Sequence, residues 1–111
     1  MSEARADNVQ WVRACGLDEV PQEGAVRVWL GDEPICIARS NDDVHAIYDV
    51  CSHAEVALSE GEVEDGTVEC WLHGSRFDLK TGQPTGLPAT KSVPVYATNV
   101  DNGDVYVALE N

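Results

Sequence analysis

Two pairs of cysteine and histidine constrain what this chain can fold into more than any other feature. Cys51 and His53 form the first pair, and Cys70 and His73 form the second, in the spacing C-x-H-x16-C-x2-H. Each pair offers one thiolate and one imidazole, so two segments that fold together would present two sulfur and two nitrogen ligands to a shared metal centre. A tetrahedral zinc ion satisfies this set, and so does a cluster of two irons and two sulfides in which histidine replaces two cysteines.

The chain around these pairs is predicted to be all-β. Short segments rich in valine and aromatic residues lie between turn signals, and no stretch keeps a helical period long enough for a core helix. Asp65-Gly66 and Asn102-Gly103 are typical of tight hairpins, because these residue types tolerate positive φ angles. We expect "GDEP" and "SNDD" to turn the chain as well, and "GLDEVPQEG" to hold one helical turn at most. The predicted strands are residues 9–15, 25–30, 35–39, 44–48, 62–64, 67–70, 76–79, 92–100 and 104–109.

The chain is acidic throughout its length. It has 111 residues, enough for one domain, and its 20 Asp and Glu against 7 Lys and Arg give a formal net charge of −13. Such a surface repels nucleic acid and anionic membranes, so neither is an expected partner, whereas a basic protein would be attracted. Solubility alone, or a salt-adapted source, would also account for this charge.

The location of the protein is predicted from its N-terminus and its cysteines. The segment "MSEARADNVQWV" lacks a cationic start followed by an apolar run, and the longest apolar run elsewhere, "AVRVWL", contains an arginine. We therefore expect no export signal, no membrane span and a cytoplasmic protein. In a reducing cytoplasm, metal binding is a better use of a Cys/His set than disulfides.

The segments "CSH" at 51–53 and "CWLHGSRFD" at 70–78 resemble the two cluster-binding boxes of the Rieske iron–sulfur family, C-x-H and C-x2-H-G. The segment "GLPA" at 86–89 falls where this family has a proline-containing loop over its cluster. The resemblance implies a Rieske fold, which is an antiparallel β-sandwich or barrel-like base with a small inserted cluster-binding subdomain. It divides the single domain 1–111 into a base of about 1–45 and 87–111 and a subdomain of about 46–86.

The resemblance also implies a ligand set for one Rieske-type [2Fe-2S] cluster. Cys51 and Cys70 would bind one iron, His53 and His73 would bind the other, and Ser75 would donate a hydrogen bond to a bridging sulfide. Two ferric ions, two sulfides, two thiolates and two neutral imidazoles sum to zero charge, whereas four thiolates would leave a charge of minus two. Histidine ligation therefore raises the reduction potential, to about −150 to +300 mV against about −400 mV for plant-type clusters.

Three departures from the high-potential members of this family point to its soluble, low-potential ferredoxins. Val56 and Leu72 stand where those members have two further cysteines joined in a disulfide. Phe77 stands where they have a tyrosine that bonds a ligand sulfur, and the membrane helix is missing here. Fewer hydrogen bonds to the cluster leave more negative charge on it and lower its potential.

The function implied by this resemblance is one-electron transfer from a flavoprotein reductase to a terminal non-haem iron oxygenase. We expect a monomeric carrier and not an enzyme, because the length leaves no room for a second domain with a two-His, one-carboxylate iron site. His53 and His73 would face outward as the exit route for the electron. Two alternatives stay open: a small subunit of a nitrite reductase, and a zinc-stabilised Cys2His2 binding module.

The remaining notable residues are expected to serve packing. Cys15 and Cys36 lie in predicted strands and read as small buried hydrophobes. His45 reads as a surface or hydrogen-bonded histidine, and Gly74 would let the backbone approach the cluster closely. Core and sheet packing is expected for Trp11, Trp29, Tyr48, Tyr96 and Tyr106. Trp71 is set apart from these residues because it falls between two predicted ligands.

Overall fold

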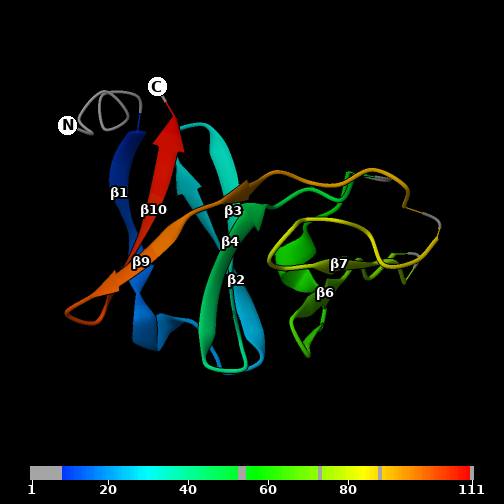
Figure 1. Cartoon of the computed structure of the whole chain (residues 1–111), viewed down its shortest axis with the longest axis horizontal. Helices are drawn as coiled ribbons and strands as arrows, with labels where there is room; N and C mark the ends of the chain where they lie inside the picture. Colours follow the sequence, from blue (N-terminus) through cyan, green and yellow to red (C-terminus); the bar gives the residue numbers. More distant parts are fainter. Residues whose placement is uncertain (1–8, 53–54, 73, 88, 111) are drawn as a thin grey trace.

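The computed structural model of the chain describes residues 9–52, 55–72, 74–87 and 89–110. In these residues the chain forms ten strands and two short 3-10 helices, in a molecule of 43 × 28 × 23 Å (Figure 1). The elements are β1 (Val9–Gly16), η1 (Leu17–Glu19), β2 (Gly24–Leu30), β3 (Glu33–Ser40), β4 (Asp43–Tyr48), η2 (Leu58–Glu60), β5 (Val63–Glu64), β6 (Thr67–Glu69), β7 (Arg76–Asp78), β8 (Val95–Tyr96), β9 (Thr98–Asp101) and β10 (Asp104–Glu110).

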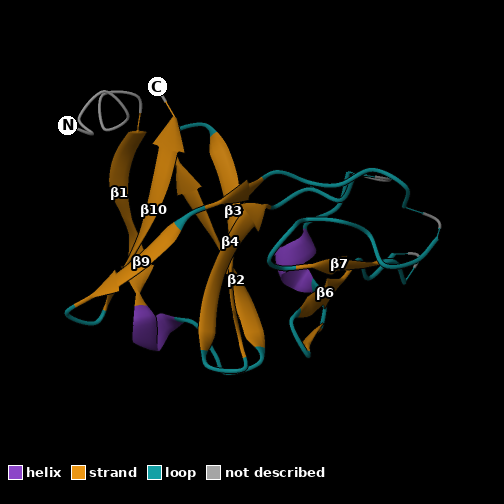
Figure 2. Ribbon diagram, in the orientation of Figure 1, coloured by secondary structure: helices purple, strands orange, loops and turns teal. Residues whose placement is uncertain are grey.

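The strands form three antiparallel sheets, in the orders β1-β10-β9, β2-β3-β4-β8 and β5-β6-β7 (Figure 2). The sheet that contains β3 is the middle layer, because β3 is buried on both faces. Successive side chains of a strand point to opposite faces. Ile35 and Ile37 accordingly pack in a core shared with β1 and β10, whereas Cys36 and Ala38 pack in a second core shared with β5, β6 and β7.

The turns follow the predicted residues. Asp65 and Gly66 have φ angles of 53° and 76°, and Asn102 and Gly103 have 56° and 81°. Gly31 in "GDEP" also has a positive φ of 67°. The predicted helical turn is η1, which covers only three residues. Turn chemistry in the sequence therefore places the hairpins of all three sheets.

One predicted strand was wrong, and one short helix was missed. The predicted strand at 92–100 is two strands, β8 and β9, which break at Ala97 and belong to different sheets. β8 pairs with β4 and β9 pairs with β10, so the chain crosses from the middle sheet to the outer one at this residue. The helix η2 was not predicted, and it lies on the path from the first cysteine pair to β5.

The tryptophans also depart from the prediction. Trp11 is 51% exposed and Trp29 is 59% exposed, so neither is a core residue. Both lie on strands at the edge of a sheet, β1 and β2, where one face of the strand meets solvent. The Trp29 ring packs on the Arg27 guanidinium, whose central carbon is 5.1 Å from the ring centroid. Cys15 and Cys36 are buried, as predicted.

Helical segments in the described part of the chain are too short and too polar to cross a bilayer.

Candidate metal centre

The first ligand loop begins directly after β4. Cys51 is buried, and its N–H donates a hydrogen bond to the carbonyl oxygen of Val56 at 3.1 Å, which folds the loop back on itself. The Ser52 hydroxyl donates to the carbonyl oxygen of Lys91 at 2.6 Å and so ties this loop to the segment before β8. His53, the predicted nitrogen ligand of this loop, lies outside the described residues.

The second ligand loop joins β6 to β7 in a tight turn. Cys70 is fully buried, its N–H donates to the carbonyl oxygen of Ser75 at 2.6 Å, and its own carbonyl oxygen accepts from the N–H of Gly74 at 2.8 Å. Gly74 has a φ of 81°, in the left-handed region that favours glycine. The left-handed backbone is therefore a second reason for glycine at position 74, besides the predicted close approach of the backbone to the cluster. His73 lies outside the described residues.

A third segment, described at residues 84–87 and 89–92, lies with both loops at one end of the molecule (Figure 1). The N–H of Ala89 donates to the hydroxyl oxygen of Ser75 at 2.9 Å. This bond uses a lone pair of Ser75 and leaves its hydroxyl proton for another acceptor, as a hydrogen bond to a bridging sulfide requires. Pro88, in the predicted covering loop, lies outside the described residues, whereas Leu87 beside it is 80% exposed.

The two thiols lie in one apolar core. Cys51 and Cys70 share it with Leu58, Phe77 and other buried side chains of the third sheet and the middle sheet. Two thiol donors at the start of two adjacent loops, with a buried hydroxyl next to them, fit an iron–sulfur cluster, because thiolates are soft ligands. The donors that the structure describes would also fit zinc, so donor chemistry alone leaves both centres open.

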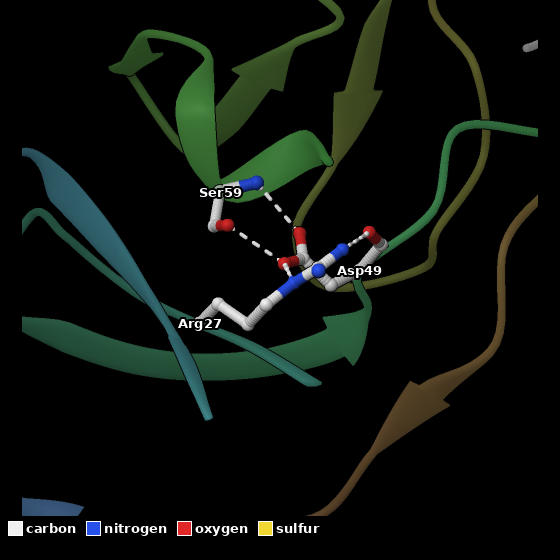
Figure 3. Close-up of polar contacts among 3 residues, drawn as sticks. All are labelled: Arg27, Asp49 and Ser59. Carbon is white, nitrogen blue, oxygen red and sulfur yellow. Dashed lines mark hydrogen bonds and ion pairs between the residues drawn. The ribbon is translucent and has the colours of Figure 1, made fainter. Parts of the chain in front are cut away.

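One buried residue beside the first loop was missed in the sequence. Asp49 is fully buried, and its carboxylate accepts hydrogen bonds from Arg27 in β2 and from Ser59 in η2 (Figure 3). The sequence signal for a buried carboxylate was an acidic residue between a predicted strand and the first predicted ligand. An acidic residue in such a place is most often exposed to solvent, so this signal is weak. Its local order depends on partners that lie 22 and 10 residues away in the sequence, which pattern reading does not find.

Cys36 is a cysteine of the same core that is not a predicted ligand. Burial, followed by the neighbouring Asp49 carboxylate, raises the pKa of the Cys36 thiol well above its usual range. Cys36 therefore stays protonated at neutral pH and does not supply a third thiolate beside the ligand loops. This agrees with its predicted role as a small hydrophobe.

A small antiparallel β fold with two buried thiols at the start of two loops is the arrangement of a metal-binding domain. The sequence matches the Rieske [2Fe-2S] domain over residues 10–97. The chain belongs to this family, whose cofactor is a Rieske-type [2Fe-2S] cluster. The predicted fold and cofactor are thereby confirmed, and the zinc-binding alternative is set aside.

Known proteins similar to this chain include ferredoxin subunits. The anthranilate 1,2-dioxygenase ferredoxin subunit of Burkholderia cepacia is 42% identical over 88% of this chain and 91% of its own length. A chain in the complex of reduced oxygenase and oxidized ferredoxin of carbazole 1,9a-dioxygenase is 33% identical, with a TM-score of 0.83 over 91% of this chain and 94% of that one. These relatives support the prediction of an electron carrier and not an enzyme.

A further solved structure belongs to the second predicted class. A protein assigned as an NADH-dependent nitrite reductase small subunit, from Mycobacterium tuberculosis, is 28% identical, with a TM-score of 0.82 over 93% of this chain and 97% of that one. Its sequence identity is lower than that of the ferredoxin subunit, although its TM-score is close to that of the chain from the carbazole 1,9a-dioxygenase complex.

Proposed function

We propose that this chain carries single electrons from a flavoprotein reductase to a terminal non-haem iron oxygenase, with Cys51, His53, Cys70 and His73 as the ligands of its cluster. When bound, the [2Fe-2S] cluster supplies a centre that takes up and releases one electron. The names of the relatives support this assignment, since they describe ferredoxins of dioxygenase systems. In this proposal the carrier is a monomer in the cytoplasm, and the reducing conditions there keep Cys15 and Cys36 as thiols.

The observation that carries the proposal is the change of environment within the second loop. Cys70 and Ser75 are buried, whereas Trp71, Leu72 and Gly74 between them are exposed. The loop therefore passes from the apolar core to the surface and back within six residues. Ligands on such a loop would hold the thiolate side of a cluster toward the core and its imidazole side toward solvent. A carrier that exchanges electrons by docking needs its cluster close to the surface in this way.

The exposed apolar side chains around the loops support docking of a protein at this end. Trp71 and Leu72 come from the second loop and Leu87 comes from the third segment, and all three are large and solvent-exposed. Exposed apolar groups on a monomer are typical of protein contact sites, and aromatic residues at the centre of a contact contribute most of its binding energy. We infer that the oxygenase and the reductase dock here.

The test is the cluster content and electron transfer of matched cysteine variants. Cys70→Ala and Cys36→Ala each remove one thiol sulfur from the same core, at a fully buried position. We expect wild type and Cys36→Ala to contain two irons and two sulfides, to be reduced by NADH through a flavoprotein reductase, and to be reoxidised by an oxygenase. Cys70→Ala should lack the cluster. Equal cluster content in the two variants, or a colourless wild-type protein that binds zinc after iron-replete expression, would contradict the proposal.

The nitrite reductase alternative has a structural neighbour in its favour and predicts a different partner. Reoxidation of the reduced protein by a nitrite reductase large subunit with nitrite, and not by a Rieske oxygenase, would favour it.

A further inference from the structure

The first ligand loop is closed at its base by one buried carboxylate. Asp49 lies two residues before Cys51, and Ser59 lies in η2 at the other end of the loop. The Ser59 N–H donates to Oδ1 of Asp49 at 2.6 Å, and the Ser59 hydroxyl donates to Oδ2 at 2.7 Å (Figure 3). These two bonds join the ends of the segment 50–58, which contains the first ligand pair.

Arg27 and Pro34 fix this carboxylate residue to the middle sheet. The Arg27 Nε donates to Oδ2 of Asp49 at 2.6 Å, and its Nη2 donates to the Asp49 carbonyl oxygen at 3.2 Å. The Asp49 N–H donates to the carbonyl oxygen of Pro34 at 2.9 Å. A buried charge is tolerated when it is paired and hydrogen-bonded, and here both carboxylate oxygens have partners. Asp49 is therefore held by β2, β3 and η2 together.

We propose that Asp49, Ser59 and Arg27 form a clasp that positions the first ligand loop for the cluster. They are positioning residues, which act through Cys51 and do not touch the iron. Ordering a loop costs conformational entropy, and a loop whose ends are already joined has less of it to lose when the metal binds. A fully satisfied buried polar network also holds one arrangement of the chain rather than several. This inference rests on the proposed role of Cys51 as a ligand.

Ser59→Ala is the decisive variant because it changes no charge. It removes the hydroxyl bond to Asp49 but keeps the Ser59 N–H bond and the Arg27 ion pair. We expect the oxidised protein with its cluster to lose iron to a chelator about tenfold faster, which is equivalent to about 1.4 kcal/mol in the activation free energy. We also expect broader lines in the electron paramagnetic resonance spectrum of the reduced cluster, since a looser loop samples several geometries.

The matched control is Ser40→Ala. Ser40 is buried whereas Ser59 is half-buried, but the Ser40 hydroxyl likewise donates to a carboxylate, that of Glu23, at 3.1 Å. The Ser40 hydroxyl oxygen accepts the N–H of Gly66 at 2.8 Å. These bonds join the end of β3 to the segment before β2 and to the β5–β6 turn, and they do not involve the ligand loops. We expect Ser40→Ala to lower the free energy of unfolding while the rate of iron loss and the resonance spectrum stay as in wild type.

Two further variants complete the experiment. Asp49→Asn keeps the size of the side chain but leaves Arg27 without its charge partner, so we expect faster iron loss than in Ser59→Ala. Ser59→Thr keeps the hydroxyl and should retain the wild-type rate of iron loss. If Asp49→Asn does not fold, the serine variants still decide. Equal rates of iron loss for Ser59→Ala and Ser40→Ala, from a wild type that holds its cluster, would overturn the clasp. A wild type with no cluster after iron-replete expression would instead overturn the proposed function.

Discussion

At the scale of single residues, Phe77 is expected to keep the reduction potential of the cluster low. It is fully buried in the core that contains Cys51 and Cys70, and it stands where the resemblance places a sulfur-bonding tyrosine in high-potential relatives. A phenyl ring offers no hydrogen-bond donor to a ligand sulfur. The reduced cluster carries one more negative charge than the oxidised one, so a missing donor disfavours reduction and lowers the potential.

Phe77→Tyr is therefore expected to raise the potential. A hydrogen bond to a charged acceptor is worth about 1.5–3 kcal/mol, but only the difference between the two redox states shifts the potential. Since about 59 mV corresponds to about 1.4 kcal/mol for one electron, a difference of about 1 kcal/mol would raise it by about 40 mV. Protein-film voltammetry measures this shift.

Phe77→Leu is the packing control for this measurement, since it alters the buried volume without adding a donor. A tyrosine variant with an intact cluster and the potential of wild type would mean that the hydroxyl does not reach a ligand sulfur. The low potential expected for this chain would then have to come from the charge and solvent exposure around the cluster.

His45 predicts a pH dependence of stability. Burial lowers the pKa of this half-buried imidazole below its ordinary value of 6.5, although Asp43 and Asp78 oppose the shift. As pH falls below 6.5, the unfolded chain takes up the proton before the folded one does, so the free energy of unfolding falls until the pH passes the folded-state pKa. Urea unfolding across this range should show a smaller loss for His45→Gln than for wild type. Parallel curves for the two proteins would contradict a lowered pKa.

At the scale of elements, the third sheet depends on a close backbone approach. Gly61, directly after η2, lies so close to the carbonyl of Glu69 in β6 that a Cβ on it would be 1.6 Å from that oxygen. The Glu69 N–H bonds the carbonyl of Glu62 next to it at 2.8 Å. A side chain at 61 would therefore push Gly61 and Glu69 apart at the open end of the β5–β6 hairpin, directly before the second ligand loop.

Gly61→Ala is expected to destabilise the protein by about 1–3 kcal/mol, the usual cost of forcing extra atoms into a packed site. Chemical denaturation of the protein with its cluster measures this. Gly86→Ala is the matched control, because a Cβ at Gly86 meets no atom within 4 Å. Should both variants unfold at the same denaturant concentration, the close approach at Gly61 does not limit stability.

The elements also show what pattern reading can reach. Hairpins such as Asn102-Gly103 were predictable because positive φ is a local property of a few residue types. The break at Ala97 was not, since it depends on which sheet each half of the segment joins. The exposure of Trp29 depends likewise on the place of β2 at the edge of its sheet. The burial of Asp49 depends on distant partners, Arg27 above all. The ligand roles of His53 and His73 and the boundaries of the base and the subdomain stay predictions.

At the scale of the whole molecule, three arginines of the described residues pair with carboxylates, and acidic residues stay in large excess. Arg13 pairs with Asp104, Arg27 with Asp49 and Arg76 with Glu69. Such pairing neutralises few of the 20 acidic residues, and the net charge is −13. A partner with a basic surface would be attracted over a long range at low salt, which raises the rate of association more than the affinity.

The association rate with the reductase or the oxygenase should therefore fall as salt is added. The Debye length shortens from about 30 Å at 0.01 M to about 8 Å at 0.15 M ionic strength. Because the molecule is 43 Å long, charges over most of its length act at low salt, and only charges near the contact act at physiological salt. Stopped-flow measurement of electron transfer at limiting partner concentration gives this rate, and equal rates at low and high salt would reduce the charge to a device for solubility.

Two charge-matched variants locate the contact. Glu55 is exposed in the first ligand loop, and Asp101 is exposed at the β9–β10 turn at the opposite end of the molecule (Figure 1). Glu55→Gln and Asp101→Asn each remove one negative charge, so at low salt both should slow association. At physiological salt only Glu55→Gln should still do so, because Asp101 lies many Debye lengths from a partner docked at the ligand loops. A slower rate for Asp101→Asn alone would place docking at the β9–β10 end and would contradict electron exchange through the loops.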